Sequence, residues 1–196
     1  MRTSAFVSAL LLSLSASPAP AEITPLERQR LASHLEMTSS WFLGEVSNLS
    51  QAQLEFRPAA GSWNILEVVE HLVMVGQIYW DDLQKAVQSK PTKRIVSSQD
   101  ADLLWYGIDR TNREKAIPPE TPKGQLRDLK AGLADYRKHH ARLLQYVKTT
   151  KDDLRNRYVD RQGCDAYQWA LLISTHEQRH ILQIREIKAD ARFSAK

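Results

Sequence analysis

Residues 166–187 read AYQWALLISTHEQRHILQIREI, and their apolar side chains recur every three or four positions. This period predicts a helix with one buried face. His176 and His180 fall on that face four positions apart, so both imidazoles can point at a single metal ion. A buried imidazole needs a hydrogen-bond partner or a metal, because an unpaired buried polar group costs about 1 to 3 kcal/mol.

A third candidate ligand lies far upstream, in the stretch WNILEVVEHL at residues 63–72. Its periodic apolar positions predict another helix, in which His71 occupies a core position. His71, His176 and His180 on two facing helices, with no fourth protein ligand nearby, predict a metal site with open coordination positions. The alternative is a set of core histidines that hydrogen-bond to hydroxyl or backbone groups. His140 also falls on an apolar stripe, where it is either a fourth ligand or a hydrogen-bond partner of one.

These ligands narrow the choice of metal without fixing it. Imidazole binds several first-row divalent ions, so zinc or nickel is expected, and iron or manganese is compatible. An ion bound by three neutral imidazoles keeps its charge, and can either acidify a bound water or hold a thiolate.

Four long amphipathic segments predict an all-α fold, a four-helix bundle. The chain has only seven glycines and no Asn-Gly or Asp-Gly hairpin signal. Helix starts are indicated by capping residues, in two cases followed by proline. The predicted starts are Thr24-Pro25, Asn64, Thr121-Pro122 and Asp165. The first helix is expected to end near Asn48 and the second near Gln88.

A long crossover is expected between the second and third helices, over residues 90–120. Prolines mark its borders, and a short helix over residues 99–113 is compatible with its pattern. It carries an aromatic and basic cluster that either roofs a pocket or packs onto the bundle. The cluster consists of Trp105, Tyr106, Arg110 and Arg113.

Residues 1–21 have the anatomy of a secretory signal peptide, with cleavage expected after Ala21. Their apolar stretch of about ten residues is shorter than the roughly 20 needed to span a bilayer. The mature chain, residues 22–196, is the size of one domain and is expected to be periplasmic or secreted. Cys164 is the only cysteine, so no intramolecular disulfide can form, although a homodimer linked through it remains open.

The charge pattern indicates a solvated surface. The formal net charge is +4, and it falls by one, to +3, when Arg2 leaves with the signal peptide. Acidic and basic residues alternate along every predicted helix, which argues against a nucleic-acid partner. The expected partner is a small molecule whose identity the sequence does not give.

The motif HEQRH at residues 176–180 also spells the H-E-x-x-H signature of zinc proteases, in which Glu177 would be the general base. The match is only local, because Gln183 and Glu186 stand where one class of these enzymes has glycine and histidine. Glu177 is nevertheless a candidate catalytic base, with a solvent-facing position as the alternative.

The stretch from Trp63 to Leu72 and the run from Asp165 to Ile184 resemble the DinB-like (DNA-damage-inducible) superfamily, over most of the mature chain. The resemblance implies a four-helix bundle in which a histidine of the second helix joins two of the last helix around a divalent metal. These positions match His71, His176 and His180. The family name refers to damage-induced expression and does not imply DNA binding.

Some members of this superfamily are metal-dependent thiol S-transferases that use bacillithiol or mycothiol, and many are classed as metal-dependent hydrolases. The resemblance therefore implies a hydrolase or transferase acting on a small molecule, with a non-catalytic metal- or ligand-binding module as the alternative. Two features depart from the family pattern. The export signal would separate this chain from a cytosolic thiol, and Glu177 replaces an expected small polar residue.

Overall fold

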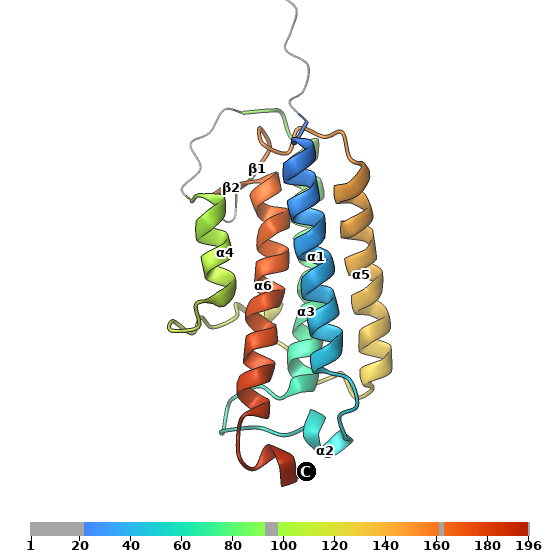
Figure 1. The fold of residues 1–196 in the computed structure, drawn as a ribbon, viewed down its shortest axis with the longest axis vertical. Helices are drawn as coiled ribbons and strands as arrows, with labels where there is room; N and C mark the ends of the chain where they lie inside the picture. Colours follow the sequence, from blue (N-terminus) through green and yellow to red (C-terminus); the bar gives the residue numbers. More distant parts are fainter. Residues whose placement is uncertain (1–21, 93–97, 161–162, 196) are drawn as a thin grey trace, which may run out of the picture.

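Four long helices run side by side in the computed structural model, which describes residues 22–92, 98–160 and 163–195 (Figure 1). The predicted signal peptide lies outside these residues. The helices are α1 (Pro25–Glu45), α3 (Ile65–Gln88), α5 (Leu129–Thr149) and α6 (Ala166–Lys188). The chain is thus largely helical, as its periodicity predicts.

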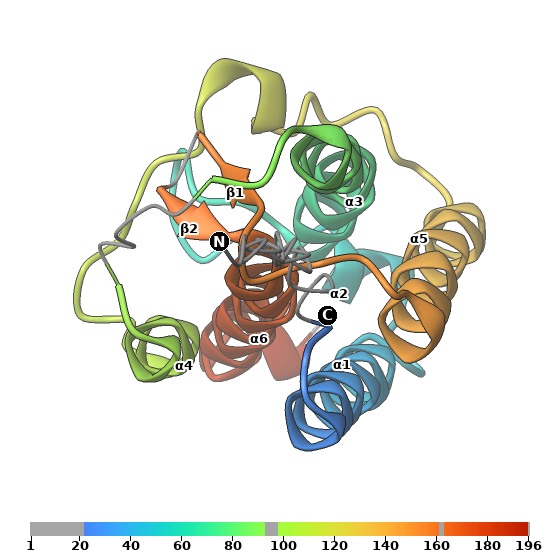
Figure 2. The same cartoon turned by 90° about the horizontal axis from the view of Figure 1, so that it is seen from above.

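The four helices form a closed ring of neighbours around one core (Figure 2). Helix α6 contacts α1 and α3, and α5 contacts the same two helices from the opposite side. Both α3 and α5 run upward in Figure 1, because the long crossover returns the chain to the lower end before α5 begins. Large apolar side chains fill the space between the helices, among them Leu31, Leu35, Phe42, Val68, Trp169 and Ile184.

Several short elements connect or extend the bundle. A single helical turn, α2 (Gln51–Leu54), precedes α3, and 3₁₀ turns cover Pro118–Glu120 and Phe193–Ala195. Strand β1 (Tyr158–Val159) pairs antiparallel with β2 (Cys164–Asp165), a small ladder that the sequence patterns do not predict. Among the described residues, no helix combines the length and apolar character needed to cross a bilayer.

Three of the four predicted helix starts are confirmed. Thr24, Asn64 and Asp165 each cap a helix, and in each case the residue three positions later returns a hydrogen bond to the cap. This reciprocal pair satisfies backbone N–H groups that the first turn leaves without an intrahelical partner. The first helix ends at Glu45, slightly before the predicted Asn48.

The predicted start of the third helix at Thr121-Pro122 is wrong, because α5 begins at Leu129. The intervening segment is held in a loop by the buried carboxylate of Glu70 on α3. Backbone N–H groups donate to it from Lys123, Gln125 and Leu126, at 2.9, 2.9 and 3.3 Å. Gly124 in the same loop has φ +66°, a left-handed conformation that does not continue a helix. A long-range acceptor therefore replaces the hydrogen bonds that helix formation would supply.

In its described residues the crossover contains one α-helix, α4 (Asp100–Ile108), which lies along α6 on the outside of the bundle (Figure 2). It packs closely because residue 107 is glycine. A Cβ atom at Gly107 would lie 2.9 Å from Gln178 Oε1 and 3.0 Å from Thr175 Cβ, closer than side chains normally approach. The missing side chain thus sets the distance between α4 and α6.

Helix α4 is shorter than the predicted helix over residues 99–113, and an arginine of α6 explains where it ends. The guanidinium of Arg179 donates to backbone carbonyls of the segment that leaves α4, namely those of Tyr106, Asp109 and Asn112. A cation at a helix C-terminus satisfies carbonyls that lack intrahelical partners and stabilises the helix dipole. Arg179 therefore fastens the end of α4 onto the bundle beside His180.

Candidate metal centre

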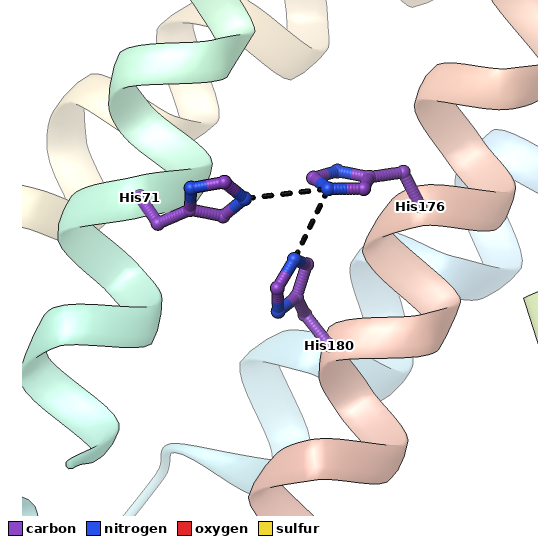
Figure 3. Close-up of side chains that lie close together, drawn as sticks. All are labelled: His71, His176 and His180. Atoms are coloured by element: carbon purple, nitrogen blue, oxygen red, sulfur yellow. Dashed lines mark hydrogen bonds between the residues drawn. The ribbon is translucent and has the colours of Figure 1, made fainter. Parts of the chain in front are cut away.

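Three histidine side chains meet between α3 and α6 (Figure 3). The Nε2 atom of His176 lies 3.3 Å from Nε2 of His71 and 3.1 Å from Nε2 of His180. One ring nitrogen from each histidine lies within 4.8 Å of the others, and no further group of this kind occurs in the described chain. The structure therefore brings together the three residues that the sequence proposes as ligands.

The rings of His71 and His180 are oriented by hydrogen bonds on their other nitrogen. Nδ1 of His71 donates to the backbone oxygen of Glu120 at 2.7 Å, and Nδ1 of His180 donates to the side-chain oxygen of Gln183 at 2.8 Å. An oxygen acceptor on Nδ1 places the proton there, so Nε2 keeps its lone pair. Both lone pairs are consequently available toward His176.

This arrangement fits a bound cation. A proton on Nε2 of His176 can satisfy only one of the two neighbouring lone pairs, whereas a cation between the rings satisfies all three nitrogens. Nitrogens that bind zinc at about 2.0 to 2.1 Å in a tetrahedron lie about 3.3 Å apart, close to the distances between these atoms. Hydrogen bonds from Nδ1 to a carbonyl oxygen are also typical of metal-binding histidines.

Burial disfavours protonation of His71 and His180. His71, His176 and His180 are 2%, 9% and 8% exposed. Burial lowers the pKa of His71 to about 4. It also lowers the pKa of His180 well below its usual value, helped by the charges of the other two histidines. Neutral imidazole is the form that binds a metal, so the site is prepared for a cation at neutral pH.

The pH dependence of metal binding follows from these lowered pKa values. Protonation removes the lone pair that binds the metal, so occupancy must fall with acid. Because the pKa of His71 is about 4 rather than 6.5, protons compete with the metal only near and below pH 4, so we expect occupancy to persist at pH 5 and to fall below about pH 4. Metal retained after buffer exchange at each pH, measured by mass spectrometry, tests this. Full occupancy at pH about 2 would contradict ligation by histidine.

The three histidines line an open cleft of about 1120 Å³. Its walls come from the loop before α3, from the segment following α4 and from α6. Trp63 stacks against His180 with ring centroids 6.0 Å apart, and Tyr79 lies 5.6 Å from His176. The site is therefore enclosed by aromatic rings on the protein side and accessible from the cleft.

Glu120 is a cleft residue that the sequence patterns did not single out. Its backbone oxygen orients His71, and its buried carboxylate accepts a hydrogen bond from the Tyr79 hydroxyl at 3.3 Å. The short 3₁₀ turn that carries it is far from His71 in the sequence. The prolines at 118 and 119 indicate a break in the chain, but no local pattern indicates contact with α3.

Glu177 takes neither the solvent-facing position nor a place in the cleft wall. It points into the bundle, where the hydroxyl of Tyr136 on α5 donates to its carboxylate. Burial raises the pKa of Glu177 to about 8, although hydrogen bonds from Tyr136 and Thr38 act in the opposite direction. The protonated form of Glu177 is therefore favoured at neutral pH. A small internal cavity of about 40 Å³ is lined by both Glu177 and His176.

His140 lies apart from the three histidines, and its Nε2 donates to the backbone oxygen of Leu35 at 3.0 Å. The crossover cluster is divided between two environments. Tyr106, Arg110 and Arg113 line the cleft, whereas Trp105 is 62% exposed. Most of the cluster thus forms a wall beside the metal centre.

Comparisons with known proteins agree with this architecture. The chain is 28% identical to the uncharacterized protein YuaE of Bacillus subtilis (strain 168) over 150 residues, which are 74% of this chain and 88% of that protein. No solved structure matches the chain. The profile of the DinB superfamily matches residues 34–184, a range that includes all three histidines and all four bundle helices in whole or in large part. The chain belongs to the DinB superfamily.

Proposed function

We propose that this chain is an exported metal-dependent hydrolase or transferase that acts on a small molecule in the cleft of about 1120 Å³. The observation that carries the proposal is the convergence of three Nε2 atoms at a site open to that cleft. Structural metal sites are normally closed by four protein ligands, whereas catalytic sites keep an open position. When bound, a divalent ion would act there as a Lewis acid toward a substrate oxygen or sulfur.

The residues of the chain have separate roles in this proposal. His71, His176 and His180 would hold a divalent ion, with zinc or nickel preferred and iron or manganese compatible. The Glu120 carbonyl and the Gln183 amide hold the His71 and His180 rings in the orientation that binding needs. Trp63 and Tyr79 shield the rings from bulk water. The substrate would enter between the loop before α3 and the segment after α4.

The experiment that tests the function starts from the mature chain, residues 22–196. Bound metal is measured by mass spectrometry, and turnover is assayed with panels of hydrolysis and thiol-transfer substrates, before and after chelation. Metal-dependent turnover supports the enzyme. A bound metal that raises the melting temperature without any turnover favours a non-catalytic binding module. Export is tested separately, by N-terminal sequencing of the secreted or periplasmic protein, with Glu22 expected as the first residue.

We further propose that Glu177 carries a proton for the reaction from behind His176, since both residues line the same internal cavity. Glu177→Gln is then expected to lower kcat by about 100-fold, the lower end of the range for general acid–base catalysis. Steady-state kinetics on the metal-loaded variant measures this. The bound metal should be unchanged, because Glu177 is not one of the three ligands.

Tyr136→Phe is the matched control for this variant. It removes the hydroxyl that donates to Glu177 but keeps the carboxyl group and the packing of the ring against Phe42. A proton-carrying Glu177 predicts a much smaller loss of kcat for Tyr136→Phe than for Glu177→Gln. Equal rates for Glu177→Gln and the wild type would assign the carboxyl group a purely structural role.

A further inference from the structure

One wall of the cleft presents hydrogen-bond donors beside His180. Arg110, just after α4, donates through Nε and Nη2 to the two carboxylate oxygens of Glu186 on α6, at 2.9 and 3.0 Å. This forked contact fixes the guanidinium, whose side chain is 16% exposed. Its third nitrogen, Nη1, makes no hydrogen bond to the described part of the chain. It is also absent from the set of buried side-chain atoms that lack a partner. Arg110 lines the cleft, so Nη1 is available to a ligand there.

Gln183 adds a second donor on the same wall. Its side-chain oxygen accepts the hydrogen bond from Nδ1 of His180 at 2.8 Å, which fixes which end of the amide is turned toward the histidine. The amide nitrogen makes no hydrogen bond to any described residue, and Gln183 also lines the cleft. Two donors from different segments therefore line the cleft that contains His180.

Cationic side chains surround Glu186 on this wall. Arg110, Arg113 and Arg179 all act on its carboxylate, and the charge of Arg110 also contributes to the lowered pKa of His180. Of the other carboxylates that line the cleft, Glu114 acts on Tyr106, and two are hydrogen-bonded within the protein. Asp102 accepts a backbone hydrogen bond at the start of α4, and Glu120 accepts one from Tyr79.

We propose that the cleft selects small molecules that carry a carboxylate or a phosphate, and that Arg110 and Gln183 hold this oxyanion beside His180. The inference rests on the proposed function, because it names the substrate class for the same cleft. Guanidinium groups bind both oxyanions through charge-assisted hydrogen bonds, which are shorter and stronger than neutral ones. A neutral ligand of the same shape has no negative charge to pair with the guanidinium of Arg110, so its hydrogen bonds to Arg110 are weaker.

The test is calorimetric titration of the zinc-loaded chain with acetate, with its neutral counterpart acetamide, and with inorganic phosphate. Acetate is expected to bind more tightly than acetamide, and Arg110→Gln should weaken acetate binding by at least about tenfold. The relative affinities of acetate and phosphate identify which oxyanion the site prefers. Arg192→Gln is the control, because its pair with Asp190 lies outside the cleft and its loss should leave binding unchanged.

Glu186→Gln separates ligand binding from a structural role of the Arg110–Glu186 pair. It breaks the same ion pair but removes the carboxylate that competes for the guanidinium, so acetate should bind more tightly than to the wild type. Weaker binding in both variants, or equal affinities for acetate and acetamide, would overturn the inference. Arg110-dependent acetate binding without any turnover would leave the inference standing and refute only the proposed catalysis. Turnover of neutral substrates with a KM unchanged by Arg110→Gln would support the proposed catalysis and refute the oxyanion site.

Discussion

Replacing His176 by alanine is expected to lower the affinity for zinc or nickel by at least about 100-fold. His176 is the central residue of the site, since its Nε2 atom lies within 3.3 Å of Nε2 in both other histidines. Loss of a group that merely orients a ligand typically costs 10- to 100-fold in metal affinity, and loss of a ligand should cost more. Titration against a competing chelator measures the affinity, and mass spectrometry measures the metal that remains after purification.

His140→Ala is the matched control for this experiment. It also removes a histidine that hydrogen-bonds within the bundle, here a half-buried one, but His140 hydrogen-bonds to Leu35 and is not part of the three-histidine group. We expect this variant to bind metal like the wild type. The same metal content in His176→Ala and the wild type would remove the assignment of the metal centre, and a loss of metal in both variants would indicate a general effect of disturbed folding.

Replacing Arg155 by alanine is expected to lower the free energy of unfolding by about 3 kcal/mol. Its guanidinium joins three helices at the end of the bundle opposite α2, by contacts of 2.7 to 3.0 Å with Glu27 of α1, Asp100 of α4 and Asp165, the cap of α6. It also lies 3.8 Å from the centre of the Tyr167 ring. Its removal would leave the buried carboxylate of Asp165 without its cation, which is costly in a partly desolvated site.

Urea denaturation of the metal-free chain measures this loss of stability. A decrease of about 3 kcal/mol corresponds to a melting temperature lower by about 6 to 12 °C in a domain of this size. The control is Arg192→Ala. Its guanidinium is largely exposed in the pair with Asp190, so the variant should change stability by less than about 1 kcal/mol. Equal unfolding midpoints for Arg155→Ala and the wild type would show that these ion pairs contribute no net stability.

The helices that the sequence predicts correctly are those whose starts are determined locally. Thr24, Asn64 and Asp165 cap their helices through a partner only three positions away, so the signal lies entirely within one turn. Thr121-Pro122 has a similar local pattern but begins no helix, because the carboxylate of Glu70 binds the backbone of the following loop. That carboxylate is distant in sequence, and local patterns contain no information about it.

The three-histidine cluster was predictable for a related reason. The spacing of His176 and His180 places both rings on one helix face, and periodicity places His71 on the buried face of another helix. The surroundings of the site were not predictable, because Glu120 and Arg110 reach it through tertiary contacts of the crossover. The sequence also did not determine which way the Glu177 side chain points, because a residue next to a ligand on a helix can face either a neighbouring helix or solvent.

Gly107 gives the architecture an unusual point of control. Because a methyl group there would collide with Thr175 and Gln178, the spacing between α4 and α6 depends on a residue that has no side chain. Exchange for alanine would push α4 away from α6 and would shift Arg110, which follows α4 closely in the chain. The position of the α4 side of the cleft therefore depends on a residue that is not itself among those that line the cleft.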